Sequence, residues 1–186
     1  RGGITLIPYF DLNANGSRDN GEPKVPGMNV RAGGGRVIMS EKDTTVRVIG
    51  LEPYTSYLVE LEGSDFENIA WQLPYRTISV TTDANMLKVI EVPVTVAGEA
   101  SGTVTLEEDG IKRGQDRIIV NFYNDKMEPA GRLLTEQDGY YTLFGLKPGN
   151  YLVRIDTAQL RRLEMTSGPD SIPFTVRAGL EGDIIE

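Results

Sequence analysis

The sequence predicts an all-β protein made of two β-sandwich domains in tandem, and three observations lead to this prediction. Short segments of alternating apolar and polar residues, such as 117–123 and 150–155, are separated by turn residues. One segment of the first half recurs in the second half. The one plausible helical pattern, at 158–164, is only one or two turns long, which suits a connector between strands.

The internal repeat relates residues 40–59 to residues 135–153. In both copies an aspartate precedes a Gly-Leu pair by the same interval, and a proline and a tyrosine follow. The matched residues are Asp43 and Asp138, Gly50-Leu51 and Gly145-Leu146, Pro53 and Pro148, and Tyr57 and Tyr151. Self-similarity of this kind indicates two copies of one fold. We therefore expect one domain over residues 1–97 and a second over residues 98–186, with equivalent Gly-Leu-x-Pro turns.

Residues 11–22 follow the first expected strand, 4–10, and have the spacing of a calcium-binding loop. Ca²⁺ is coordinated by six to eight oxygen atoms at roughly 2.3–2.6 Å, so alternate residues of a tight loop must converge on one point. Side-chain oxygens fall at the required positions, Gly16 permits the bend, and Ser17 offers its backbone carbonyl. The predicted ligands are Asp11, Asn13, Asn15, Ser17, Asp19 and Glu22.

The segments around this loop exclude an EF-hand, which needs a helix on each side. The preceding segment is a short apolar run, and Pro23 and Pro26-Gly27 follow the loop. We expect the loop to join the first strand to another at about residues 28–32. The alternative is a plain hairpin in which Asn15-Gly16 forms a type I′ turn, but it gives no reason for the other spaced oxygen-bearing residues.

The expected role of the ion is structural. The carboxylates of Asp11, Asp19 and Glu22 repel one another in the empty loop, and a cation turns that repulsion into attraction. Because two ligands are amides and Arg18 and Lys24 lie close in the sequence, we expect a dissociation constant on the order of 10⁻⁴–10⁻³ M. Substituting Glu22 by alanine is expected to abolish the calcium effect and to leave the calcium-free stability nearly unchanged.

The composition excludes several classes of site. The 186 residues include no histidine and no cysteine, which excludes histidine general bases, Ser-His and Cys-His nucleophile pairs, the usual zinc sites and disulfides. A net charge of −8 argues against nucleic acid and against an anionic membrane surface as partners. No apolar stretch is long enough to span a membrane as a helix, and the abrupt start at Arg1 leads us to expect a piece of a larger protein.

Two further features of the sequence can each be interpreted structurally or functionally. Segment 64–75 contains the only tryptophan, Trp71, which could stack on a sugar or peptide or could pack with Phe66 over the open end of the first sandwich. We favour packing. The acid pair Glu107-Glu108 does not suit a glycosidase, because adjacent strand residues point to opposite faces instead of facing each other across a cleft.

The loop also supports a family resemblance. Residues 11–22, followed by Met28-Asn29-Val30, resemble the opening of the calcium-binding B repeats of serine-aspartate-repeat adhesins, which are related to collagen-adhesin B-type domains. The pattern over 135–151 is similar to the second half of the same prealbumin-like (transthyretin-like) sandwich, which carboxypeptidase-regulatory-like modules share. The resemblance implies a prealbumin-like sandwich for both domains, and it places the family's calcium ligands on the six residues named above.

Departures from the family limit what the resemblance implies. The stretch after Leu106 lacks alternating ligands, so no second calcium site is expected in the second domain. B-type domains often contain an internal isopeptide bond with its lysine in the first strand. Neither 4–10 nor 101–106 contains a lysine, and alternation points Lys88 away from its neighbours' face, so no such bond is expected here.

Together these features predict a non-enzymatic structural or adhesive module, a stalk or display segment of a larger bacterial surface or secreted protein, with Ca²⁺ stabilising its first domain. The alternatives are a β-sandwich that binds a glycan or peptide, and a soluble appendage of an outer-membrane usher-like protein. The expected location is extracytoplasmic, at the cell surface, secreted or in the periplasm. The expected partners are neighbouring domains of the same chain and a host or cell-surface protein or glycan, with no nucleic acid and no membrane insertion.

Overall fold

The computed structural model describes all residues, 1–186, as two compact units, Arg1–Val96 (unit 1) and Ala97–Glu186 (unit 2). The expected all-β class is confirmed, because almost all regular structure is strand and the one α-helix, α1, spans only Thr157–Arg162. The division between the units falls one residue before the boundary expected from the repeat. No helix is long and apolar enough to cross a membrane.

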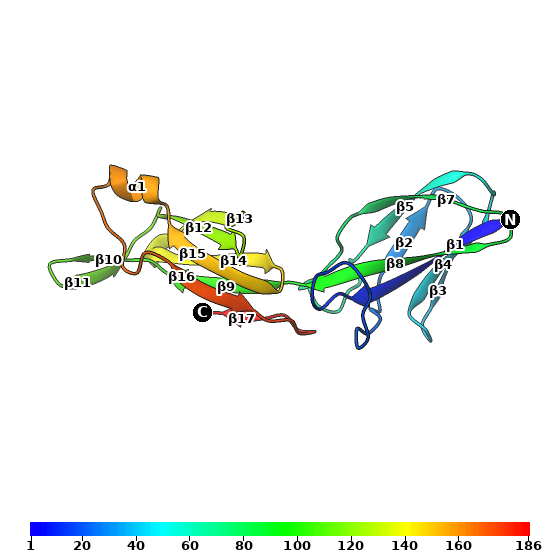
Figure 1. Ribbon diagram of the computed structural model, residues 1–186, viewed down its shortest axis with the longest axis horizontal. Helices are drawn as coiled ribbons and strands as arrows, with labels where there is room; N and C mark the ends of the chain where they lie inside the picture. Colours follow the sequence, from blue (N-terminus) through cyan, green and yellow to red (C-terminus); the bar gives the residue numbers. More distant parts are fainter. The chain divides into compact units, whose positions relative to one another are not determined.

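Unit 1 is a sandwich of two sheets (Figure 1). Its strands are β1 (Gly2–Phe10), β2 (Asn29–Ala32), β3 (Arg36–Ser40), β4 (Thr45–Leu51), β5 (Ser56–Glu62), β6 (Trp71–Gln72), β7 (Thr77–Thr81) and β8 (Leu87–Val96). One sheet has the order β3-β4-β1-β8-β6 and the other the order β2-β5-β7. Ile4, Val48 and Val92 of the first sheet pack against Val59 and Val80 of the second. Alternate apolar residues of each strand thus form the core.

Unit 2 is built in the same way. Its elements are β9 (Gly98–Thr103), β10 (Thr105–Glu108), β11 (Ile111–Gly114), β12 (Ile119–Asn124), β13 (Pro129–Leu134), the 3₁₀ turn η1 (Gln137–Gly139), β14 (Tyr140–Leu146), β15 (Gly149–Ile155), α1, β16 (Ile172–Val176) and β17 (Ile184–Ile185). Its sheets have the orders β13-β12-β15-β16 and β14-β9-β17, and β10-β11 is a separate two-stranded ribbon. Ala100 and Leu146 pack against Phe122, Val153 and Val176 in the core.

Six strands of each unit have the same pairing. In unit 1, β1 pairs antiparallel with β4 and parallel with β8, while β5 pairs antiparallel with β2 and β7. In unit 2, β9 pairs antiparallel with β14 and parallel with β17, while β15 pairs antiparallel with β12 and β16. The strands outside this framework differ: β3 pairs with β4, whereas β13 pairs with β12 in the other sheet, and β6 and the β10-β11 ribbon each occur in one unit only. The repeat therefore predicts the common framework of six strands but not the place of β3 and β13.

The Gly-Leu turns lie at equivalent places in the two units. Gly50 and Gly145 have φ of 79° and 87°, a conformation that favours glycine, and the leucine after each is buried. Leu51 pairs with Gly2 and Leu146 with Gly98, each at an irregularity in the ladder. A side chain at Gly98 would meet Val176, so close packing of the sheets requires glycine there. The tyrosine after each turn also hydrogen-bonds the turn backbone: Glu52 N donates to the Tyr57 hydroxyl at 3.0 Å, and the Tyr151 hydroxyl donates to Lys147 O at 2.7 Å.

Candidate metal centre

The loop with calcium-type spacing leaves the end of β1 and returns to it. Phe10 N donates to Pro23 O at 2.8 Å, and Val25 N donates to Pro8 O at 2.9 Å. Asp11 N donates to Val94 O of β8 at 2.9 Å. The two ends of the loop are therefore fixed to the same strand, which brings Asp11 and Glu22 close together. The strands on either side, β1 and β2, belong to different sheets, so the loop does not close a hairpin between paired strands.

Two of the predicted ligands are buried carboxylates. Asp11 is 2% exposed and accepts hydrogen bonds from Asn15 N at 3.0 Å and Gly16 N at 2.8 Å. Glu22 is 7% exposed and accepts from Leu12 N at 2.9 Å and Asp19 N at 2.8 Å. Backbone N–H groups thus supply all the protein hydrogen bonds to these carboxylates, and neither carboxylate forms an ion pair with lysine or arginine.

The other predicted ligands form a hydrogen-bonded chain along the exposed side of the loop. Asn13 Oδ1 accepts from Asn15 N at 3.1 Å, and Asn15 Oδ1 accepts from Ser17 N at 2.8 Å. Asp19 Oδ2 accepts from Asn13 Nδ2 at 2.8 Å and Asn15 Nδ2 at 2.7 Å. These two amide hydrogen bonds hold the pKa of Asp19 below its usual range. The six residues lie in one loop, but no three carboxylates converge on one point as they would around an ion.

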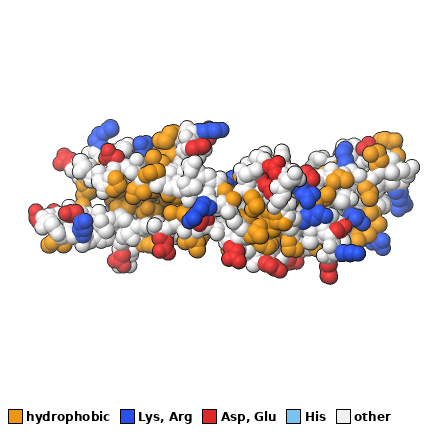
Figure 2. Space-filling view, turned by 60° about the horizontal axis from the view of Figure 1, so that its bottom comes forward, with side chains coloured by type: hydrophobic (Ala, Val, Ile, Leu, Met, Phe, Trp, Pro, Cys, Tyr) orange, Lys and Arg blue, Asp and Glu red, His pale blue; other side chains and the backbone are white.

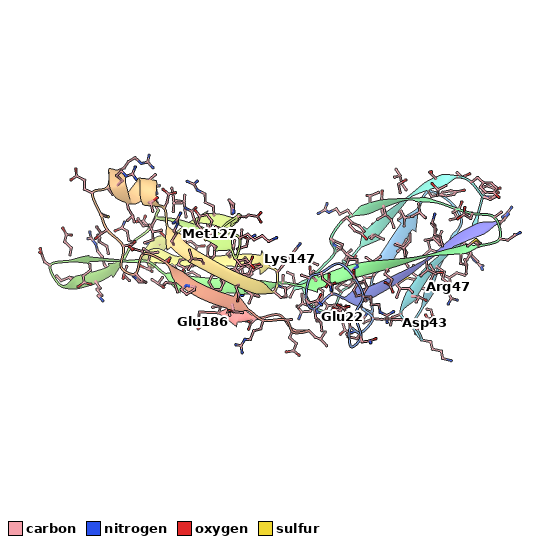
Figure 3. All side chains as sticks on the ribbon, viewed as in Figure 1. Glu22, Asp43, Arg47, Met127, Lys147 and Glu186 are labelled. Carbon is pink, nitrogen blue, oxygen red and sulfur yellow. The ribbon has the colours of Figure 1, made fainter.

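The basic residues near the loop, Arg18 and Lys24, have their partners outside it. Arg18 lies 3.8 Å from Glu91 of β8. Lys24 Nζ donates at 3.1 Å to the backbone oxygen of Asp43, which lies in the β3–β4 turn and is labelled with Glu22 in Figure 3. Glu91 offsets part of the Arg18 charge, whereas Lys24, bound to a neutral carbonyl, keeps its positive charge, so the expectation that the two residues weaken cation binding stays a prediction. Lys24 instead ties the end of the loop to the turn in which Asp43 also pairs with Arg47 at 3.3 Å.

Tyr9 reports the electrostatic environment of this loop. It is 1% exposed, and burial together with the negative charges of Asp11, Glu22 and Glu91 raises its pKa to about 12. Ionisation of the Tyr9 hydroxyl is thus strongly disfavoured, because it would add a further negative charge beside these carboxylates. Tyr9 was not among the residues predicted from the sequence, although it lies two residues before Asp11 at the end of β1, where strand alternation puts both side chains on the same side.

The loop backbone excludes the simple turn alternative. A type I′ turn at Asn15-Gly16 needs positive φ at both residues. Gly16 has φ of 76°, but Asn15 is not among the residues with positive φ, whereas Ala14 is, at 56°. The loop is therefore an extended twelve-residue structure held by its own side chains.

Trp71 packs beneath the loop. Its ring centroid lies 4.8 Å from that of Phe10 and 5.9 Å from that of Phe66, both edge to face. Phe66 and Trp71 pack against a small second core formed by Phe10, Val25, Val94 and Val96. The packing interpretation of Trp71 agrees with this arrangement, and the loop and the small core share β1 and β8.

Unit 2 has no equivalent loop. The chain after β9 forms the β10-β11 ribbon, in which Glu107 lies 3.5 Å from Lys112 and Glu108 lies 3.8 Å from Arg113. These acids are exposed and paired across the ribbon, so they do not face each other across a cleft. Lys88 donates to Thr81 O at 3.0 Å and lies 4.0 Å from Asp83 at the surface of unit 1, and this exposed position does not suit an isopeptide bond.

Comparisons with known proteins give remote structural similarities. No protein-family model matches the sequence, and no curated protein sequence matches it either. Among solved structures, the chain is similar to the minor pilin GBS52 of Streptococcus agalactiae, with 12% identity, a TM-score of 0.41, and coverage of 100% of this chain and 93% of the pilin. It is also similar to the shaft pilin SpaA of Lactobacillus rhamnosus GG, with 8% identity, a TM-score of 0.35, and coverage of 99% and 96%.

A third similar structure is the Bacillus anthracis TIE protein, with 14% identity and a TM-score of 0.39. The match covers 98% of this chain but only 33% of the TIE protein, so the chain spans about a third of that protein's length. At these TM-scores and identities the similarities do not assign a function, and the resemblance to calcium-binding B repeats remains a prediction from the loop residues.

Proposed function

We propose that this chain is a non-enzymatic structural module of a larger extracytoplasmic bacterial protein, and that Ca²⁺ stabilises its first unit at residues 11–22. The observation that carries the proposal is the pair of buried carboxylates, Asp11 and Glu22, which have no basic partner. Burying two like charges in one loop is unfavourable unless a positive charge balances them. The raised pKa of Tyr9 fits the same negative environment.

The chemistry of the donor set fits a hard cation. The loop offers three carboxylates, two amide oxygens and a backbone carbonyl, all oxygen ligands of the kind that Ca²⁺ prefers. Asp11, Asn13, Asn15, Ser17, Asp19 and Glu22 are the residues that would hold the ion. In the structure, the Asn13 and Asn15 amide N–H groups stabilise Asp19, which is the role that a cation would take over.

A bound ion would stiffen more than the loop. Asp11 is hydrogen-bonded to β8, and Glu22 is hydrogen-bonded to Leu12 and Asp19 on opposite sides of the loop. An ion bound by both Asp11 and Glu22 would therefore hold the end of β1 against β8. It would also stabilise the packing of the small core around Phe10 and Trp71. This is the property required of a spacer that must keep its shape outside the cell.

The surface chemistry supports a structural role over a catalytic one. The chain has no histidine or cysteine, and its acidic groups are scattered among basic and apolar side chains over the face shown in Figure 2. Unit 2 has an open cleft of about 860 Å³ whose lining includes Glu107, Lys112 and Tyr141. Two of these, Glu107 and Lys112, pair with each other at 3.5 Å.

The test is the melting temperature with calcium and with a chelator. A ligand that binds only the folded protein adds about 2.7 kcal/mol at a hundredfold excess over its dissociation constant. That gain corresponds to a rise of about 10 °C or more in the transition of a domain of this size. Isothermal titration calorimetry should give a dissociation constant on the order of 10⁻⁴–10⁻³ M.

The best variant for this test is Asp19→Asn. The exposed Asp19 side chain accepts no backbone hydrogen bond, so its change removes a charged ligand at little cost to the calcium-free protein. Glu60→Gln, on the exposed face of β5, is the control with the same change of charge. We expect D19N to lose most of the calcium shift and E60Q to keep it. An unchanged melting temperature of the parent in millimolar calcium would contradict the calcium proposal.

A further inference from the structure

The loop at residues 11–22 contains the dipeptide Asn-Gly twice, at Asn15-Gly16 and at Asn20-Gly21, and the rest of the chain does not contain it. An asparagine before glycine is chemically labile, because glycine has no side chain to hinder attack of its nitrogen on the preceding side-chain amide. Both asparagines are exposed, so access of solvent does not distinguish the two sites. Their hydrogen bonds do distinguish them.

Asn15 and the nitrogen that could attack it are both held by hydrogen bonds. Asn15 Oδ1 accepts from Ser17 N at 2.8 Å, and Asn15 Nδ2 donates to Asp19 Oδ2 at 2.7 Å. Gly16 N donates to Oδ2 of the buried Asp11 carboxylate at 2.8 Å. Attack requires Gly16 N to lose its proton, and the carboxylate beside it disfavours the resulting negative charge. These three hydrogen bonds therefore oppose the reaction at Asn15.

Asn20-Gly21 has none of these restraints. The two residues form the middle of a turn in which Glu22 N donates to Asp19 O at 3.3 Å. Gly21 has φ of 93°, close to the value of about 80° at the third residue of a type II turn. The Asn20 side chain and Gly21 N form no hydrogen bond within the protein. The amide of Asn20 is therefore free to rotate toward Gly21 N, and that nitrogen is free to lose its proton to water.

We propose that Asn20 is a site of spontaneous deamidation and that the folded loop protects Asn15 from the same reaction. Gly21 N gives its proton to water and forms a bond to Cγ of Asn20. The bond from Cγ to Nδ2 breaks, and Nδ2 takes up a proton and leaves as ammonia. A water molecule then opens the cyclic succinimide at either of its carbonyl groups, which gives aspartate or isoaspartate at this position. Water is the only co-reactant, and no group is oxidised or reduced.

The reaction changes the part of the loop that positions Glu22. The Glu22 carboxylate accepts from Asp19 N at 2.8 Å, and only Asn20 and Gly21 separate these two residues in the chain. Both products replace a neutral amide by a carboxylate next to Asp19, which adds repulsion between like charges. In isoaspartate the backbone also runs through the former side chain and is longer by a methylene group. Deamidation therefore loosens the turn that holds Glu22 in place, whether or not the loop binds an ion.

Tryptic peptide mapping tests the proposal, because cleavage after Arg18 and Lys24 separates the two sites into the peptides 2–18 and 19–24. The folded chain is incubated with a chelator at mildly alkaline pH, and mass spectrometry with fragmentation follows conversion at each asparagine. We expect Asn15 to react about tenfold or more slowly than Asn20, because three hydrogen bonds oppose its reaction. In guanidinium chloride, which removes the structure, the two rates should become similar. Equal rates in the folded chain, or a faster rate at Asn15, would overturn the proposal.

Asn20→Ser tests the effect of the reaction on the loop, because serine suits a turn and has no amide to lose. Trp71 is the only tryptophan and belongs to unit 1, so its fluorescence follows the melting of this unit alone. We expect the aged parent to melt at a lower temperature than the fresh parent in chelator, and N20S to melt at the same temperature before and after ageing. An aged parent that is mostly converted at Asn20 and melts like the fresh one would overturn the loosening of the turn.

Discussion

At the scale of single residues, the loop after β1 depends on side-chain to backbone hydrogen bonds that could not be predicted from the spacing of its ligands in the sequence. Glu22 accepts from two backbone N–H groups while buried, so it supports the loop even when no ion is bound. A buried donor left unpaired costs about 1–3 kcal/mol, and the Leu12 and Asp19 N–H groups, which are only partly buried, should cost less. Glu22→Ala is therefore less suited to isolating the ion, because it also removes these two hydrogen bonds. Asp19 is the residue whose change isolates the effect of the ion.

The titration of Tyr9 is a second test at the residue scale. The raised pKa means that the folded protein disfavours the phenolate, so stability is unaffected below pH 10 and falls as the pH rises toward 12. A calcium ion beside Asp11 and Glu22 should lower this pKa, because it offsets their negative charge. Ultraviolet titration of the parent minus Tyr9→Phe, with and without calcium, measures the shift. An identical Tyr9 pKa in both conditions would place the ion elsewhere.

The spacing of the ligands could be predicted because it is local, whereas their environment could not. A twelve-residue loop determines which oxygens can approach one another, and all six predicted residues lie in that loop. The partners of Lys24 and Arg18 come from the β3–β4 turn and from β8, which are distant in the sequence. The packing of Phe10 against Trp71 likewise depends on the meeting of β1 and β6 on either side of β8.

At the scale of elements, the short helix α1 begins at a well-formed cap. The Asp156 side chain accepts from Gln159 N at 2.8 Å and from Asn121 Nδ2 at 3.1 Å. These hydrogen bonds hold the pKa of Asp156 below its usual range. Gln159 in turn accepts from Ile119 N of β12, so the cap fixes the connector between β15 and β16 to the sheet.

Removing the α1 cap should destabilise unit 2 modestly. Asp156→Ala is expected to lower the free energy of unfolding by about 1 kcal/mol, as loss of a helix N-cap typically does. Because folding lowers the pKa of Asp156, this contribution is complete above the ordinary carboxyl pKa and disappears as the pH falls below it. Urea unfolding at neutral and acidic pH, with the exposed Asp125→Ala as control, measures both effects. A D156A loss that persisted unchanged in acid would contradict the role of the carboxylate.

Turn chemistry explains both a success and a failure of the element predictions. The Gly-Leu-x-Pro signal located equivalent turns because glycine with positive φ is needed in both copies. The β10-β11 ribbon was not predicted, although Asp109-Gly110, with φ of 49° and 80°, is a strong hairpin signal. The sheet to which β3 or β13 belongs could not be predicted, because each forms a local hairpin with a neighbour in the sequence, β3 with the following strand β4 and β13 with the preceding strand β12, and the alternation of the residues does not select between these two partners.

At the scale of the whole molecule, calcium should act on one unit only. The proposed ligands belong to unit 1, and unit 2 has the β10-β11 ribbon at the equivalent place. Hydrogen exchange of the intact chain should therefore show slower exchange on calcium addition in residues 11–25 and in the end of β8. Exchange in β12 and β15 should not change. Equal protection of both units would indicate a general effect of the salt and not a bound ion.

The parallel pairing of β1 and β8 has a mechanical consequence. The chain enters unit 1 at the start of β1 and leaves it at the end of β8, and the two strands are paired side by side from Gly3–Leu87 to Phe10–Val94. Tension applied along the chain would pull these strands past each other in shear, so all the hydrogen bonds of this ladder would resist together instead of opening one at a time. The proposed ion would lie where β1 ends beside β8 and would hold the end of this ladder together, so we expect calcium to raise the force at which unit 1 unfolds.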